Sequence, residues 1–169
     1  MGYVKTENLS GYISELRKWK TVIQLCKRGF PVKDRLSDFA DMTAEAGMEM
    51  FSLHRNIDDL IKCDLDELDA IAAVGVKYLP IGWLPKERLA GGALFEETCA
   101  LIRTYGAEAK KRGMLLMYHN HDFDLDLLEG KPMLDHLYDA LPADVLGAEL
   151  DTCWLYSGRV DPAAYIRSY

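Results

Sequence analysis

The sequence predicts an α/β fold organised around a parallel β-sheet. One unit recurs along the 169 residues: an amphipathic helix, a glycine, a short apolar strand and a polar strand end. Strands that alternate with helices imply right-handed βαβ crossovers, which make neighbouring strands parallel. In sheets of this kind the functional residues gather at the carboxyl ends of the strands. We therefore expect the polar residues that follow the strands to form one site.

Four helix–strand units justify this fold class. The expected helices cover residues 36–46, 64–74, 93–112 and 132–138. The expected strands cover residues 48–53, 76–81 and 145–150, and a further expected strand begins at Leu115 and carries His119 and His121. The first three helices each end at a glycine, which adopts the left-handed backbone of a helix end without strain: Gly47, Gly75 and Gly113. Asp64 and Glu67 resemble a capping box at the second helix, and Asp161 followed by Pro162 begins a further helix.

The first 34 residues differ from these units. Residues 3–6 predict a short strand that ends at Glu7, and the spacing of apolar residues predicts a helix within residues 9–31. A chain of this length builds one hydrophobic core. We therefore expect a single domain over 1–169, with a divergent segment 1–34 and βα units over 35–169.

Composition narrows the class of protein. The chain is 49% hydrophobic and 28% charged, as is typical of soluble globular proteins. A net charge of -7 argues against a nucleic-acid partner, because no basic face offsets the acidic excess. No apolar run approaches the roughly 18 residues of a membrane helix, so no membrane partner is expected. The four cysteines lie far apart without a CxxC pair, and we expect reduced thiols in a cytoplasmic protein.

Two pairs of residues at strand ends carry the candidate chemistry. Alternate side chains of a strand share a face, so His119 points with His121, and Glu149 points with Asp151. His119, His121 and Asp151 are the predicted metal ligands, because two nitrogens and one carboxylate suit Mn, Zn, Co or Fe better than Ca. The alternatives are histidines hydrogen-bonded in a barrel mouth and an Asp151 that caps a following turn. Glu149 lies one pleat deeper, as either an ion-pair partner or the predicted proton-transfer group.

Three further side chains lie at the same predicted rim. His54, Trp83 and Trp154 each follow a strand, and we expect them to contact the substrate. An indole ring stacks on the apolar face of a sugar, although tryptophans at strand ends also serve simply to cover a core.

These residues resemble a known family. The run Tyr-His-Asn-His-Asp-Phe-Asp at 118–124, the run Glu-Leu-Asp-Thr-Cys-Trp at 149–154, and then Gly158 and Asp161-Pro162 resemble the sugar phosphate isomerase/epimerase family of xylose isomerase-like TIM barrels. The resemblance extends from about Arg35 to Tyr169. It implies a (β/α)8 barrel with a divalent metal such as Mn, Zn, Co or Mg at the strand ends, where the metal orients sugar oxygens while acidic or histidine groups move protons.

The resemblance also places individual residues. Asp151 matches the family's metal-binding aspartate, and His119 falls at or beside the position of a glutamate ligand. Asp124 stands where this subgroup usually has glutamate, and Trp154 stands where other branches have a substrate-contacting histidine. A complete barrel needs roughly 250 residues. We therefore expect a truncated member: a partial TIM barrel of about five parallel strands that lacks the first and last strands. Its two unpaired edges favour self-association or a partner that supplies the missing strands.

Three functions follow as expectations. The first is isomerisation or epimerisation of a small-molecule sugar or sugar phosphate by metal-assisted proton transfer. The second is a keto-sugar or inosose dehydratase or lyase, whose reaction begins with the same proton abstraction. The third is a non-catalytic truncated barrel or subunit. A nuclease of the endonuclease IV kind ranks last, because it needs a basic face for DNA.

Overall fold

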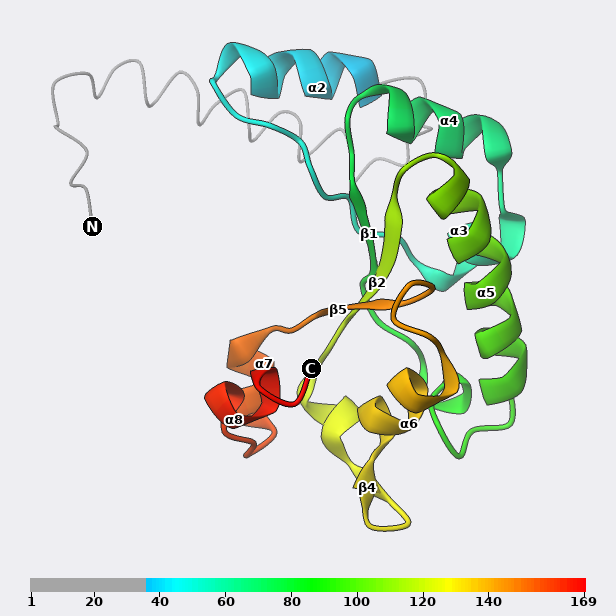
Figure 1. Ribbon diagram of the computed structural model, residues 1–169, viewed down its shortest axis with the longest axis vertical. Helices are drawn as coiled ribbons and strands as arrows, with labels where there is room; N and C mark the ends of the chain where they lie inside the picture. Colours follow the sequence, from blue (N-terminus) through cyan, green and yellow to red (C-terminus); the bar gives the residue numbers. More distant parts are fainter. Residues whose placement is uncertain (1–35) are drawn as a thin grey trace, which may run out of the picture. The chain divides into compact units, whose positions relative to one another are not determined.

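The computed structural model describes residues 36–169 (Figure 1). The strand expected at 3–6 and the helix expected within 9–31 lie outside the described residues. The chain divides into two compact units, residues 1–48 and residues 49–169, and the expectation of a single domain stays a prediction. The described part of the first unit, residues 36–48, contains helix α2 (Leu36–Glu45). It ends as expected at Gly47, whose φ of 71° is left-handed.

The second unit is built on the parallel sheet that the sequence predicts. Strands β1 (Tyr78–Ile81), β2 (Leu115–His119) and β5 (Gly147–Glu149) lie in the order β1-β2-β5 and are parallel. The register pairs Ile81 with Tyr118 and His119 with Glu149. The last residues of β2 and β5 therefore stand directly opposite each other at the carboxyl edge of the sheet.

The strand expected at 48–53 is replaced by a less regular segment at residues 51–55. Residues 51–55 lie parallel to β1 through two isolated bridges, Ser52 with Tyr78 and Arg55 with Ile81. The carbonyl of Phe51 accepts hydrogen bonds from both Lys77 N and Tyr78 N, at 2.8 and 3.1 Å. This double acceptance breaks the even spacing of a parallel ladder. The segment still ends at the expected edge, because Arg55 N donates to the carbonyl of Pro80 at 2.7 Å.

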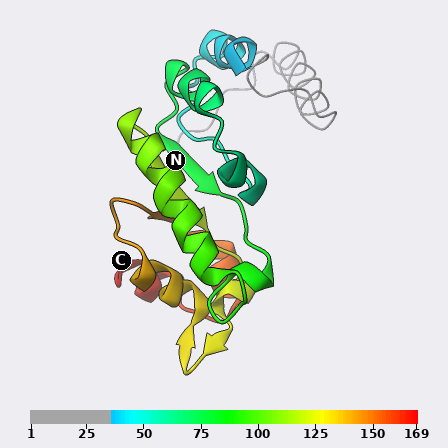
Figure 2. The same cartoon turned by 90° about the vertical axis from the view of Figure 1, so that its right-hand side faces the viewer.

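Helices flank the sheet as the alternating pattern predicts. The other helices are α3 (Ile57–Lys62), α4 (Leu65–Ala73), α5 (Phe95–Lys111), α6 (Met133–Ala140), α7 (Thr152–Ser157) and α8 (Pro162–Ile166). Two 3-10 turns, η2 (Lys86–Arg88) and η3 (Asp122–Leu125), and the antiparallel hairpin β3 (Leu127–Leu128) with β4 (Lys131–Pro132) complete the chain. Helices α3, α4 and α5 lie along one side of the strands (Figures 1 and 2). None of the helices within residues 36–169 is long and apolar enough to cross a membrane.

The hydrophobic core lies between the sheet and α5. Leu116 and Tyr118 of β2 are fully buried, and Ile102 and Tyr105 of α5 pack on the same side. The alternate positions of β2, which end at His119, are only partly buried. The core therefore fixes one face of the strands, and the site residues stand at the edge of the other face.

Local hydrogen bonds explain where the helices begin. Asp64 Oδ1 accepts from Glu67 N at 3.1 Å, which is half of the expected capping box. The other half is absent at this helix, because the Glu67 carboxylate lies 2.8 Å from Arg55 Nη2 instead. The reciprocal box occurs one helix earlier, between Asn56 and Asp59.

Candidate functional site

One carboxylate oxygen joins the strand ends. Glu149 Oε2 lies 2.9 Å from His119 Nδ1 and 2.9 Å from His54 Nε2. His119 is the last residue of β2, Glu149 is the last residue of β5, and His54 comes from segment 51–55. The two imidazole rings lie 5.1 Å apart between centroids. The strand order thus brings together three residues that are up to 95 positions apart in the sequence.

These contacts fix the tautomers of both histidines when Glu149 is ionised. An ionised carboxylate only accepts hydrogen bonds, so His54 Nε2 and His119 Nδ1 must each carry the proton that is donated. In a neutral imidazole the other nitrogen then has a free lone pair. For His119 this nitrogen is Nε2, which lies 3.8 Å from Asp151 Oδ2. A carboxylate that orients a histidine in this way is the usual support of a metal-binding imidazole.

Asp151 fulfils the capping role that the sequence left open. Its Oδ1 accepts from Cys153 N at 2.8 Å and from Trp154 N at 3.1 Å, so Asp151 is the N-cap of α7. The side chain divides its two oxygens, because Oδ1 caps the helix while Oδ2 faces His119. The cap and the candidate ligand role therefore do not exclude each other.

His121 lies in an aromatic surrounding. Its ring stacks on Phe123 with an interplanar angle of 8° and a centroid distance of 5.3 Å. Trp154 and His119 contact the same ring at centroid distances of 5.2 Å each. Burial, together with the neighbouring His119, lowers the pKa of His121 below its usual value. His121 Nδ1 is buried and finds no hydrogen-bond partner within the described part of the chain.

Two features of the site offer candidate ligand atoms for a divalent cation. The buried, unpartnered Nδ1 of His121 is a polar atom with an unmet requirement, and a neutral imidazole is a common metal ligand. His54, His119 and Glu149 also offer ligand atoms that lie within 4.8 Å of one another. Nitrogen and carboxylate donors together suit transition metals.

Two buried polar residues beside the site are missing from the set predicted by residue chemistry. Asn120 is fully buried, and its side chain contacts the backbone of Asp151. Asp124 is also fully buried, and it accepts from His121 N at 2.7 Å and from the Tyr118 hydroxyl at 3.0 Å. Burial raises the pKa of Asp124 to about 6. For Asn120 the available signal was its position, because it continues the buried face of β2 and a buried polar group needs a partner. Asp124 lies in the turn η3, where alternation along a strand gives no such signal.

The two tryptophans differ in their placement. Trp154 lies on α7 against His121, as an aromatic wall of the site. Trp83 is 53% exposed, and no ring contact or hydrogen bond in the described residues joins it to the histidines. The structure therefore brings together His54, His119, His121, Glu149, Asp151 and Trp154. Contact of Trp83 with a substrate stays a prediction.

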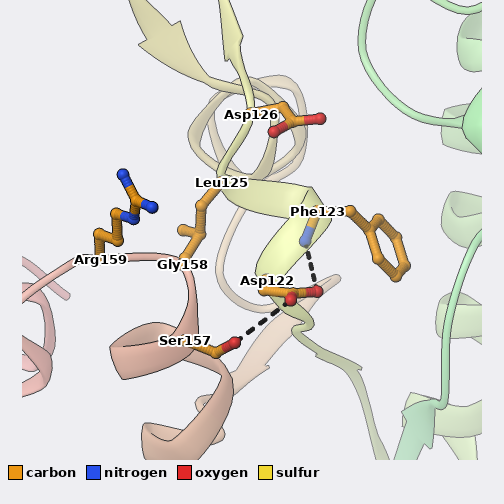
Figure 3. Close-up of a pocket in the computed structure, with 7 residues that line it drawn as sticks. All are labelled: Asp122, Phe123, Leu125, Asp126, Ser157, Gly158 and Arg159. Carbon is orange, nitrogen blue, oxygen red and sulfur yellow. Dashed lines mark hydrogen bonds between the residues drawn. The ribbon is translucent and has the colours of Figure 1, made fainter.

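A polar hollow of about 380 Å³ lies between η3 and the end of α7 (Figure 3). Its lining residues are Asp122, Phe123, Leu125, Asp126, Ser157, Gly158 and Arg159. Asp122 accepts hydrogen bonds from Phe123 N at 2.9 Å and from Ser157 Oγ at 3.3 Å, which ties η3 to the end of α7. Phe123 belongs to both the hollow and the ring stack on His121. The hollow therefore adjoins the site through Phe123.

No protein-family model and no curated protein matches the sequence. Among solved structures, the chain is similar to a sugar phosphate isomerase/epimerase from Parabacteroides distasonis ATCC 8503, with a TM-score of 0.67 and 22% identity over 79% of this chain and 52% of that chain. A second sugar phosphate isomerase/epimerase from that organism has a TM-score of 0.63 and 20% identity over 79% and 58% of the two chains. A xylose isomerase domain protein from Planctomyces limnophilus has a TM-score of 0.58 and 11% identity over 81% and 57%.

The chain spans about half the length of these solved structures. At these identities the likeness concerns the fold. The parallel order β1-β2-β5 and the flanking helices confirm the predicted fold class. The chain therefore has the fold of the xylose isomerase-like sugar phosphate isomerases/epimerases, and its described part forms a partial barrel of that type.

Proposed function

We propose that this site carries out metal-assisted proton transfer on a sugar or sugar phosphate, as an isomerase or epimerase. The observation that carries the proposal is the contact of Glu149 Oε2 with two imidazole nitrogens, both at 2.9 Å. A carboxylate beside two imidazoles at the edge of a parallel sheet is suited to take a proton from carbon and to return it. The likeness to sugar phosphate isomerase/epimerase structures supports the choice of substrate class.

His119, Asp151 and His121 are the residues that would hold a divalent cation. Two ligand atoms that are each about 2.1 Å from one ion lie about 3.0–3.6 Å apart at coordination angles of about 90–120°. The distance of 3.8 Å between His119 Nε2 and Asp151 Oδ2 is close to this range. The contacts of 2.9 Å around Glu149 have the length of hydrogen bonds. A bound divalent cation would polarise the carbonyl oxygen of the substrate.

Glu149 is the proposed proton-transfer group. Its ionised carboxylate takes a proton from the carbon next to the substrate carbonyl. In an isomerisation the protonated form returns the proton to the former carbonyl carbon, while the hydroxyl proton of the first carbon moves to the former carbonyl oxygen. In an epimerisation the same carbon regains a proton on its opposite face. The hydrogen bonds from His54 and His119 orient the carboxylate toward this step. His54 exposes 52% of its side chain, so it also remains accessible to a substrate hydroxyl.

Aromatic side chains define the substrate class further. Trp154 is 37% exposed and Phe123 is 38% exposed, and both contact the ring of His121. Exposed aromatic faces beside polar groups suit the mixed apolar and hydroxylated surface of a sugar. Trp83 is assigned to the same substrate on the strength of its position after β1.

Two other functions use the same residues. A dehydratase or lyase acting on a keto-sugar begins with the same proton abstraction and then expels a hydroxyl group. A non-catalytic barrel or subunit would bind a sugar without turnover, and the span of about half the length of the matched structures favours it for this chain alone.

The test combines Mn²⁺ binding with proton exchange. Manganese affinity is measured by electron paramagnetic resonance, and deuterium incorporation from D₂O into fructose 6-phosphate is followed by NMR. The wild-type chain is expected to bind Mn²⁺ and to exchange the proton. Glu149→Gln is expected to weaken Mn²⁺ binding by about 10- to 100-fold, because Glu149 orients His119, while exchange measured at saturating Mn²⁺ falls by about 100-fold or more. Glu129→Gln removes an exposed carboxylate from the hairpin turn and serves as the matched control.

The results for Mn²⁺ binding and for the products distinguish between the proposed roles of Glu149 and between the candidate functions. Complete loss of Mn²⁺ binding in Glu149→Gln, even at high Mn²⁺ concentration, would make Glu149 a ligand and favour the group of His54, His119 and Glu149. Release of water from the substrate, observed as a new dehydrated product, would favour the lyase. Mn²⁺ binding by the wild type with no exchange above that of the free ion would contradict catalysis and favour the non-catalytic barrel.

A further inference from the structure

The main-chain ladder between β2 and β5 ends at the rung formed by His119 and Glu149. Beyond this rung, the side chain of Asn120 makes the hydrogen bonds that join the two segments. Asn120 Oδ1 accepts from Asp151 N at 2.7 Å, and Asn120 Nδ2 donates to the carbonyl of Asp151 at 3.3 Å. A carboxamide has the same acceptor and donor as a peptide group, so it replaces one further rung of the ladder.

Asparagine fits position 120 better than other side chains of similar size do. Asn120 is fully buried, and an unpaired polar group there would cost free energy. An aspartate of the same size would accept from Asp151 N but would have no proton for the Asp151 carbonyl. A leucine or alanine would leave both backbone groups without this partner. The two hydrogen bonds thus require the amide.

The two hydrogen bonds of Asn120 act on Asp151, whose carboxylate contacts both α7 and His119. The backbone of Asp151 is extended, with φ of -80° and ψ of 109°, at the point where β5 gives way to α7. In this conformation Oδ1 caps α7 while Oδ2 faces His119 Nε2 at 3.8 Å. Asn120 itself lies between His119 and His121, so its side chain ties the segment that carries both histidines to the segment that carries Asp151.

We propose that Asn120 is a positioning residue, whose side-chain amide fixes the peptide group of Asp151 and so holds the Asp151 carboxylate beside His119. This inference rests on the proposed function for its chemical purpose, because it assigns Asn120 to the support of the metal-binding pair. Asn120 is fully buried, so we assign it no direct contact with a substrate.

The experiment compares three variants of the full chain labelled with ¹⁵N. Asn120→Ala removes both hydrogen bonds, and Asn120→Asp keeps the acceptor but not the donor. Thr98→Ala is the control, because Thr98 is also fully buried and polar but belongs to α5, where its hydroxyl bonds to the carbonyl of Leu94. Hydrogen exchange of the Asp151 amide, the chemical shifts of the His119 imidazole and Mn²⁺ affinity are measured for each.

The amide of Asp151 is expected to exchange about tenfold faster in Asn120→Ala than in Thr98→Ala, after both are normalised to an amide of β1. The His119 imidazole shifts should move in Asn120→Ala and remain in Thr98→Ala. Mn²⁺ affinity should fall by about 10- to 100-fold in both Asn120 variants.

Unchanged protection of the Asp151 amide in Asn120→Ala would overturn the inference, as would equal Mn²⁺ affinities for Asn120→Ala and Thr98→Ala. Exchange and imidazole shifts are read without metal or substrate. A wild-type chain that binds no Mn²⁺ would therefore refute the proposed function, while the first two measurements still decide whether Asn120 positions Asp151.

Discussion

His119 Nδ1 and Glu149 Oε2 lie 2.9 Å apart across a single rung of the β2–β5 ladder. Because the two residues are register partners, the strand pairing itself places the imidazole against the carboxylate. The site therefore depends on the sheet more than on the loops that follow it. Changes that shift β5 relative to β2 are expected to act on the site from a distance.

Two substitutions of Asp151 separate its role as the N-cap of α7 from its candidate role as a metal ligand. Asp151→Ala removes the acceptor for Cys153 N and Trp154 N, so the free energy of unfolding should fall by about 1 kcal/mol. Asp151→Asn keeps an oxygen that caps α7 but lacks the charge that binds a cation, so unfolding should change little while Mn²⁺ affinity falls. Urea unfolding and Mn²⁺ titration measure the two effects. Equal Mn²⁺ affinity in Asp151→Asn and the wild type would remove Asp151 from the ligand set.

Asp124 should give the chain a stability that depends on pH. Burial raises its pKa to about 6 from 3.8. The folded state then holds the proton more tightly than the unfolded state. The contribution is fully present below pH 3.8 and is lost as the pH rises to about 6. The wild type should lose up to about 3 kcal/mol of unfolding free energy between these limits.

Asp124→Asn checks this dependence, because the amide does not titrate in this range. Its unfolding free energy should change less between pH 4 and pH 7 than that of the wild type, when both are measured by urea unfolding. Asp126→Asn alters an exposed carboxylate two residues away and should follow the wild-type profile. Parallel profiles for Asp124→Asn and the wild type would show that Asp124 is not responsible.

The pattern of residues predicted the sheet well, for a physical reason. Glycines that end helices act locally, and alternation in a strand is a local rule, so both are visible in sequence. Gly47, Gly75 and Gly113 all have positive φ in the structure, and His119 and Glu149 lie at the carboxyl edge of the sheet as expected, although β5 ends at Glu149 and not at residue 150. The contact between His119 and Glu149 could be expected because neighbouring parallel strands end at the same edge of a sheet.

Short elements escaped prediction because they hold few periodic residues. Helix α3 has six residues, fewer than two turns, and its signal is the capping pair Asn56 and Asp59. The hairpin of β3 and β4 has two residues in each strand. Asn120 escaped for a different reason, since its partner is the backbone of Asp151, and no residue type in the sequence reports a backbone partner.

Gly106 is expected to be required for the spacing between α5 and the chain that leads into β5. A Cβ at this position would lie 2.9 Å from the carbonyl oxygen of Val145. Alanine in a helix normally gains about 1 kcal/mol over glycine, but overpacking against backbone costs about 1–3 kcal/mol. Gly106→Ala should therefore lower the unfolding free energy, and it should weaken the His119–Glu149 contact by shifting β5.

The neighbouring position supplies the control for this prediction. Ala107 is exposed on the same helix, and Ala107→Gly should cost about 1 kcal/mol through helix propensity alone. Urea unfolding measures stability, and the His119 imidazole shifts in NMR spectra report the site. Stabilisation of the chain by Gly106→Ala would show that the segment at Val145 moves aside without cost.

Arg55 should stabilise the segment that carries His54. Its side chain is 3% exposed, and Nη2 lies 2.8 Å from Glu67 Oε2 and 3.4 Å from Asp59 Oδ1. Arg55→Met removes the cation and leaves two poorly hydrated carboxylates facing each other. Loss of one partner of a buried ion pair costs about 3 kcal/mol or more. We expect a decrease of that size in the unfolding free energy, measured by urea at pH 7.

A second substitution tests whether the unpaired carboxylates cause the loss of unfolding free energy. In Arg55→Met with Glu67→Gln one of the two carboxylates is neutral, so the double variant should recover part of the loss. Arg103→Met alters an exposed arginine that donates to the carbonyl of Ala140 at 2.9 Å, and it should cost less than about 1 kcal/mol. If the double variant proved less stable than Arg55→Met alone, repulsion between carboxylates would not explain the effect. The packing of the aliphatic part of the Arg55 side chain would then be its main contribution to the unfolding free energy.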